Sequence, residues 1–175
     1  IGAVCAYTLD GECIGELDNE TFSADLAIVT ITGRNIHPGL ATGKMVNAIR
    51  LAGVFLSRMP WQKLAPETTA NRDGFLHPYV IEGGVHEVKL RIILRSFVTA
   101  ELAEHAAVLR RVADSILVEH PQAKINMEVK KQYRNMREAL EKEPRAVHLA
   151  AEAIRRVGLE PKFQSIRGGT DGSRL

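Results

Sequence analysis

The chain has 175 residues, of which 45% are hydrophobic, and its formal net charge is +2 at pH 7. This length fits one domain or one and a fraction, with enough apolar sequence for a buried core. No apolar run approaches the roughly 20 residues that a transmembrane helix needs, so we expect no membrane partner. Lysine and arginine are mixed with acidic residues rather than gathered in one block, so charge predicts no nucleic-acid partner.

The two cysteines, Cys5 and Cys13, lie in β-like sequence without CxxC spacing. Such sparse cysteine usage is typical of a reducing compartment. We therefore interpret both cysteines as packing residues and predict a cytoplasmic location. The chain starts at Ile1 without a methionine, directly in strand-like sequence, and we expect it to be a piece of a longer protein.

A β-branched, apolar stretch begins the central part of the chain. Residues 22–33 (FSADLAIVTITG) are apolar on both faces, which predicts a buried strand. A helix is predicted over residues 42–58, followed by a polar loop that extends to about Asp73. The apolar stripe of this helix has the three- and four-residue steps of one helix face: Met45, Ala48, Ile49, Ala52, Phe55 and Leu56.

Two strand patterns, FLHPYVIE and HEVKLRIILRSF, meet at Gly83-Gly84, a dipeptide suited to a tight hairpin turn. Thr99 is predicted to cap the next helix, which Pro121 ends. KINMEVKK then alternates apolar and polar residues, which predicts a strand with one solvated face. The core stripe of the second helix comprises Leu102, Ala106, Leu109, Ala113, Ile116 and Leu117.

The resulting order, β-α-β-β-α-β, predicts an α+β domain of the ferredoxin-like (split βαβ) type over residues 21–133, with two helices on one face of a four-stranded antiparallel sheet. Residues 1–20 and 134–175 do not belong to this unit. The second flank contains a predicted helix over residues 144–158, from Pro144 to Gly158. We expect the flanks to be two edges of an α/β domain into which the smaller domain is inserted.

Six short motifs follow one another along the chain. They are AYTLDG (residues 6–11), IHPG (36–39), KMVNA (44–48), PETT with DGF and His77, YRNMRE (133–138) and IRGGTDG (166–172). In order and spacing the chain resembles the peptidase T family of di-zinc tripeptide aminopeptidases over almost its whole length. The resemblance implies a catalytic domain that binds two zinc ions, and an inserted lid domain that forms a homodimer and closes over a tripeptide substrate.

Asp10 follows a strand pattern and precedes Gly11. The residues alone favour a turn aspartate, because Asp-Gly after a strand is a common turn signal. The resemblance implies a zinc ligand, since the family's aspartate in this Tyr-Thr-x-Asp-Gly string is one. Glu12 and Cys13 depart from the glycines usual in the family, and we do not count Cys13 as a ligand.

His37 lies on a Pro-Gly turn between the first strand and the first helix. A loop histidine with one hydrogen bond is the simpler interpretation, but Pro38 fixes φ and Gly39 frees the next turn, so the imidazole is carried on a stiff projection. The resemblance implies that this histidine reaches an active site, often the partner subunit's, and stabilises the oxyanion formed during peptide hydrolysis. His37 is therefore our candidate catalytic residue.

Arg95 and Arg167 are the candidate substrate-binding residues. Arg95 shares a strand face with Lys89, Arg91 and Ile93, so a solvated cation is the competing interpretation. A guanidinium can hold a carboxylate through two parallel hydrogen bonds, as a small-peptide enzyme needs at the C-terminus of its substrate. The resemblance places a family arginine at each position, while a plain glycine turn remains an alternative for the loop after Arg167.

The resemblance also implies that the general base and most of the family's zinc ligands lie outside this chain, so we expect the chain alone to be inactive. Asn135 is a family marker without an assigned chemistry. A rival function from another class is a non-enzymatic ferredoxin-like module that dimerises or binds a small effector, since that fold hosts many functions. RNA binding by the sheet would need exposed aromatic residues, whereas aromatics are only 5% of the chain.

Overall fold

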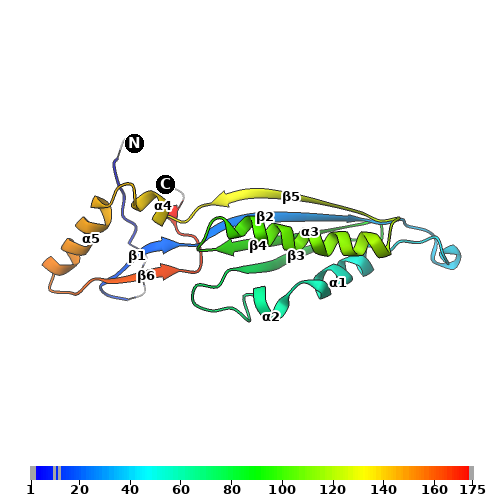
Figure 1. Cartoon of the computed structure of the whole chain (residues 1–175), viewed down its shortest axis with the longest axis horizontal. Coiled ribbons are helices and arrows are strands. Elements are labelled where there is room, and N and C mark those ends of the chain that lie inside the picture. The colour runs from blue at the N-terminus through cyan, green and yellow to red at the C-terminus, as the bar shows by residue number, and fades with distance from the viewer. Residues whose placement is uncertain (1–2, 10, 12, 174–175) are drawn as a thin grey trace.

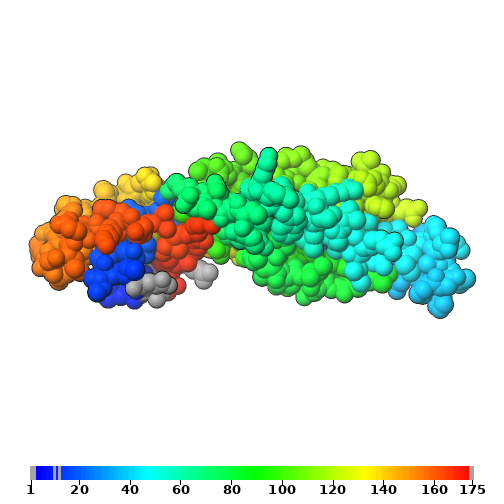
Figure 2. All heavy atoms as spheres, turned by 90° about the horizontal axis from the view of Figure 1, so that it is seen from below, coloured from blue at the N-terminus to red at the C-terminus, as the bar shows by residue number. Residues whose placement is uncertain are grey.

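The computed structural model describes residues 3–9, 11 and 13–173. The molecule is elongated, with a large four-stranded antiparallel sheet and a smaller parallel pair of strands (Figures 1 and 2). The bounds of the elements are β1 Glu16–Thr21, β2 Ser23–Thr32, η1 Pro38–Leu40, α1 Ala48–Arg58, α2 Trp61–Leu64, β3 Phe75–Gly83, β4 Glu87–Ser96, α3 Glu101–Glu119, β5 Lys124–Tyr133, α4 Arg137–Leu140, α5 Arg145–Arg156, β6 Lys162–Ile166 and η2 Asp171–Ser173.

The α+β, ferredoxin-like prediction is confirmed. The large sheet has the strand order β3-β4-β2-β5, and every neighbouring pair is antiparallel. Helices α1 and α3 cover one face of it (Figure 1). We call this sheet with its two helices the lid. The flanks contribute the parallel pair β1–β6 with α5 beside it, while the domain boundaries at residues 20/21 and 133/134 stay a prediction.

The core lies between the large sheet and its two helices. Val29 and Ile31 of β2 are fully buried against α1 and α3, and a buried side chain of this size contributes about 1.5–3 kcal/mol. Leu26 and Ile28, on the opposite face of β2, are only half-buried. The prediction that this strand is buried on both faces is therefore wrong, because helices cover only one side of the sheet.

Two predicted helix starts are also wrong. Helix α1 begins at Ala48, not at residue 42, because Asn47 caps it by accepting hydrogen bonds from the backbone N–H groups of Ile49 (2.9 Å) and Arg50 (3.3 Å). Thr99 does not cap α3. The Thr99 hydroxyl instead contacts Ser23 at 2.6 Å and donates to Glu138, so it links the lid to the second flank.

The predictions of the other three strands of the large sheet are confirmed, whereas residues 3–9, which are strand-like in sequence, form no strand. Gly83 ends β3 with φ of 137°, which other residues rarely adopt, and the hairpin to β4 follows. Both cysteines, in contrast, are exposed free thiols in the segment before β1, so their interpretation as packing residues is wrong. No helix in the described parts of the chain is long and apolar enough to cross a membrane.

Candidate functional site

His37 lies in the loop of residues 34–46, at the end of the lid opposite the β1–β6 pair (Figure 1). Reciprocal backbone hydrogen bonds between Arg34 and Val46 close this loop at 2.8 and 3.0 Å. The His37 side chain is exposed, and its Nδ1 accepts a hydrogen bond from the Gly39 N–H at 3.2 Å. In the neutral ring the proton is then on Nε2, which leaves Nε2–H available as a donor to another group.

Three phenylalanines form a separate small core at the other end of the lid. The Phe22 ring lies 4.3 Å from Phe97 and 5.6 Å from Phe75, between ring centroids. The Arg167 guanidinium lies 5.6 Å from Phe22 and 5.5 Å from Phe75, while that of Arg95 lies 5.8 Å from Phe75. The aromatic rings thus hold two cations side by side. We call these five residues the arginine–phenylalanine centre.

The two arginines meet although they are 72 residues apart in the sequence: Arg95 Nη1 donates to the carbonyl of Arg167 at 3.4 Å. The Arg167 guanidinium donates to the Thr69 carbonyl (3.0 Å), the Thr69 hydroxyl (2.9 Å) and the Asp73 carbonyl (3.0 Å). Within the described part of the chain, the buried Nε–H groups of both arginines have no acceptor. The centre therefore concentrates positive charge, which suits an anionic group.

A polar network next to this centre was not predicted from the sequence. The Glu20 carboxylate, in a side chain only 8% exposed, accepts two hydrogen bonds from Arg72 at 2.7 and 2.8 Å. These bonds lower the pKa of Glu20 below its ordinary value, so the carboxylate stays charged. Asn135 Oδ1 accepts from the N–H groups of Thr21 (3.1 Å) and Arg137 (3.0 Å), and its Nδ2 donates to the Phe97 carbonyl at 3.0 Å.

Glu20, Arg72 and Asn135 thereby link both flanks to the lid. Asn135 could have been noticed as part of YRNMRE, although the motif does not say what it binds. Glu20 and Arg72 look like ordinary surface charges in the sequence, and only the fold places them together.

The three predicted site residues that the structure describes lie in two different regions. Arg95 and Arg167 lie together, while His37 lies beyond the far end of β2. Because a strand rises about 3.3 Å per residue, the ten residues of β2 separate these two places by about 30 Å. Asp10 is outside the described residues. Among the residues that the structure does describe, no group of three or more His, Cys, Asp or Glu could hold a metal ion.

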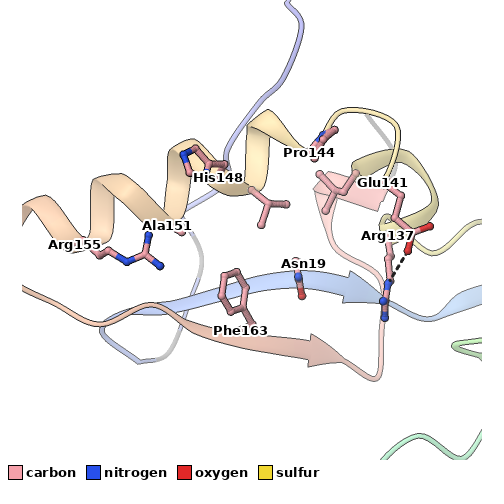
Figure 3. Close-up of a pocket in the computed structure, with 10 residues that line it drawn as sticks. Asn19, Arg137, Glu141, Pro144, His148, Ala151, Arg155 and Phe163 are labelled. Carbon is pink, nitrogen blue, oxygen red and sulfur yellow. Dashed lines mark hydrogen bonds and ion pairs between the residues drawn. The ribbon is translucent and has the colours of Figure 1, made fainter.

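A pocket of about 490 Å³ lies between α5 and the β1–β6 pair (Figure 3). None of the three predicted site residues that the structure describes lines it, and Arg137 and Glu141 are paired at its edge at 3.0 Å. Its lining is Asn19, Arg137, Leu140, Glu141, Pro144, Val147, His148, Ala151, Arg155 and Phe163.

Two proteins with similar sequences are peptidases. Peptidase T of Geobacillus kaustophilus (strain HTA426) is 42% identical over 174 residues, which are 99% of this chain and 42% of that protein. Peptidase T of Bacillus subtilis (strain 168) is 41% identical over 170 residues, 97% of this chain and 41% of that protein. The chain thus spans less than half the length of these curated relatives.

Solved structures share the fold. The aminopeptidase PepT from Bacillus cereus superposes with a TM-score of 0.75 at 21% identity, over 94% of this chain and 44% of that one. A tripeptidase from Staphylococcus aureus superposes with a TM-score of 0.72 at 24% identity, over 91% of this chain and 42% of that one. A Bacillus subtilis dinuclear metal binding peptidase of the M20 family superposes with a TM-score of 0.54 at 14% identity, over 85% of this chain and 36% of that one.

The lid also matches a family model. The model is described as "Peptidase dimerisation domain", and it matches residues 19–124, which include β2, α1, β3, β4 and α3. This match covers more than half of the 175 residues. The chain therefore belongs to the family of peptidase dimerisation domains.

Proposed function

We propose that this chain is the lid-bearing part of a longer metal-dependent aminopeptidase, called here the parent enzyme, which removes the N-terminal residue from tripeptides in the cytoplasm. The six motifs and the 42% identity to Peptidase T over 99% of the chain support this activity. The non-enzymatic module is not favoured, because the similarity to peptidases extends through both flanks as well as the lid.

The convergence of Arg95 and Arg167 is the observation that carries the proposal. Two guanidinium groups above Phe22 and Phe75 present a compact cationic surface at the junction of lid and flank. In a free tripeptide, unlike in a longer peptide, the C-terminal carboxylate belongs to the third residue from the N-terminus. In the proposed enzyme, the two arginines bind this carboxylate through charge-assisted hydrogen bonds and so select short substrates.

His37 is proposed to act on a substrate bound by the partner subunit. An extended tripeptide spans at most about 11 Å, whereas about 30 Å separates His37 from the arginines of the same chain. One tripeptide therefore cannot contact both from one chain in this arrangement. The free Nε2–H of His37 would donate to the oxyanion in the active site of the partner.

Two zinc ions per active site are proposed for the parent enzyme, with Asp10 as one ligand. When bound, such ions polarise the peptide carbonyl and activate the attacking water. The described residues do not fit a complete two-metal centre. In this proposal the other ligands and the general base belong to the part of the parent enzyme that lies outside this chain.

The purified 175-residue chain is accordingly expected to hydrolyse no tripeptide, with zinc or cobalt added. The measurement is release of the N-terminal residue against a blank that contains the metal alone. Turnover above the blank would show that the active site has been misplaced. The decisive companion observation is the sequence that precedes Ile1 and follows Leu175 in the source genome, because the proposal requires zinc-ligand sequences on both sides.

We further propose that the homodimer forms along β3 and the start of α1. The two outer strands of the sheet differ: β5 exposes charged side chains such as Lys130, which oppose edge pairing, whereas β3 exposes Ile81 (57%). Ile49 of α1 is 50% exposed. The backbone of Ala48 donates to Val85 in the β3–β4 hairpin at 2.9 Å, which keeps the start of α1 at this edge.

Replacing Ile81 with lysine is expected to weaken the dimer more than about tenfold, because the two-fold axis would place like charges close to each other. Equilibrium sedimentation of the chain gives the dissociation constant. The matched control is Gln132→Lys, which adds the same charge to the exposed surface of β5 and should leave self-association unchanged. If Gln132→Lys weakens the dimer more than Ile81→Lys does, the interface lies at β5 instead. A monomeric unsubstituted chain would contradict the proposal.

A further inference from the structure

The loop of residues 65–74 connects α2 to β3 and is held partly by its own turns. The Thr69 hydroxyl donates to the Ala65 carbonyl at 2.7 Å, and the Asp73 N–H donates to the Ala70 carbonyl at 2.9 Å. These bonds shape two short turns within the loop. They do not fix the loop relative to the flanks, so its position depends on contacts made by other parts of the chain.

Two arginines make those contacts from opposite directions. Arg167, after β6, reaches into the loop and donates to Thr69 and Asp73 through three hydrogen bonds of 2.9–3.0 Å. Arg72 reaches out of the loop to Glu20 on β1, where its Nη1 donates to Oε2 and its Nη2 donates to Oε1. The Arg72 guanidinium also lies 4.6 Å from the centre of the Phe97 ring, which restricts its position further.

Glu20 is a fixed anchor for this contact. Its carboxylate lies 3.6 Å from Arg137 Nη1 and accepts a hydrogen bond from Asn135 Nδ2 at 3.4 Å. The Asn135 side chain is itself held by the backbone N–H groups of Thr21 and Arg137. Arg72, in contrast, is 58% exposed and comes from a loop. Loss of the ion pair would therefore remove one of the two contacts that hold the loop, and leave its position to Arg167 alone, while β1 kept its place.

We propose that Arg72 and Glu20 are positioning residues for the carboxylate-binding arginines: their ion pair fixes the loop of residues 65–74, and the loop fixes the guanidinium of Arg167. The proposal rests on the proposed function, because it concerns how the parent enzyme recognises the C-terminal carboxylate of its substrate. It gives a role to two residues that do not themselves contact the substrate.

The test compares a tripeptide that has a free C-terminal carboxylate with the same tripeptide as its C-terminal amide, in the parent enzyme. For Arg72→Ala we expect the KM of the acid to rise about tenfold with kcat changed less than about twofold, and the KM of the amide to stay the same. The preference for the acid then falls about tenfold. Glu20→Gln should lower it similarly, and the double variant should be no worse than either single variant.

Two further variants separate positioning from general stability. Arg72→Lys keeps one charge-assisted bond to Glu20 and should recover part of the preference. Arg91→Ala is the matched control, since Arg91 of β4 makes an exposed ion pair with Glu82 of β3 at 3.3 Å and, within the described part of the chain, its side chain forms no hydrogen bond or ion pair with the loop. It should leave the acid-to-amide preference unchanged.

The outcomes distinguish this inference from the proposed function. If Arg167→Ala removes the preference while Arg72→Ala leaves it intact, the positioning role is wrong and carboxylate binding by Arg167 stands. If Arg72→Ala lowers turnover of acid and amide equally, its role is merely structural and the inference fails. If Arg167→Ala itself leaves the preference unchanged, the proposed carboxylate site is wrong, and the positioning role falls with it.

Discussion

Replacing His37 with alanine in the parent enzyme is expected to lower kcat by about 10²–10³-fold, with a smaller change in KM. This is the usual cost of removing one donor to a developing oxyanion, about 2.7–4 kcal/mol of transition-state stabilisation. The fold and the metal content should not change, because the side chain is exposed and the backbone bridge between Arg34 and Val46 closes its loop independently. Steady-state kinetics and metal analysis of the purified variant measure both parts.

His86→Ala is the matched control. His86 is also exposed at this end of the lid, where its carbonyl accepts a hydrogen bond from Gly33 at 2.8 Å, but it does not lie on the Pro-Gly turn. Its substitution should leave kcat near that of the unsubstituted enzyme. Near-normal kcat for His37→Ala would return His37 to the interpretation of an ordinary loop histidine.

Mixing two inactive variants tests whether His37 acts across the dimer. After subunit exchange of His37→Ala with Asp10→Ala, half of the dimers are mixed, and each has one site with intact metal ligands and an intact partner histidine. Activity should therefore recover to about a quarter of the original value. If exchange is demonstrated and no activity returns, His37 acts within its own subunit.

Replacing Asn135 with alanine is expected to destabilise the chain by about 2–6 kcal/mol. The substitution leaves the buried N–H of Thr21 without its acceptor and the Phe97 carbonyl without its donor, and each such loss costs about 1–3 kcal/mol. For a protein of this size, the melting temperature should fall by about 4–24 °C. Thermal unfolding of the 175-residue chain, followed by circular dichroism, measures the shift.

Two comparisons define the origin of the effect. Asn126→Ala removes the same side chain from an exposed position on β5 and should change the free energy of unfolding by less than about 0.5 kcal/mol. Asn135→Asp keeps an acceptor for Thr21 but brings a second carboxylate beside Glu20, so it should also destabilise the chain at neutral pH. Equal melting temperatures for Asn135→Ala and Asn126→Ala would contradict the role of Asn135 at the junction.

Local patterns predicted the strands and helices of the lid because alternation and helical spacing are properties of neighbouring residues. The start of the first helix was missed for a local reason as well. Met45 continues the apolar spacing backwards from Ala48, but Gly43 adopts φ of 68° and Asn47 provides the cap, so the helix begins later. The signal for the later start was Asn47, a capping residue that lies between the apolar residues Met45 and Ala48.

The candidate site depended on information of another kind. His37, Arg95 and Arg167 were selected because motifs resembled a known family, and the fold then brought the two arginines together. The Glu20–Arg72 pair joins residues 52 positions apart, and the Asn135–Glu20 contact joins residues 115 positions apart. No periodicity or spacing encodes such pairings, because they arise from how the two sheets meet.

The parallel pairing of β1 with β6 has a consequence for the order in which the chain can fold during synthesis. Residues 16–21 are made well before their partner strand, residues 162–166, and every residue of the lid is made between the two strands. The lid, whose hairpin and helices are made of nearer neighbours, can form while β1 still waits for its partner. Because β1 exposes unpaired backbone groups during this interval, we expect wrong strand pairing to be a greater hazard at β1 than within the lid.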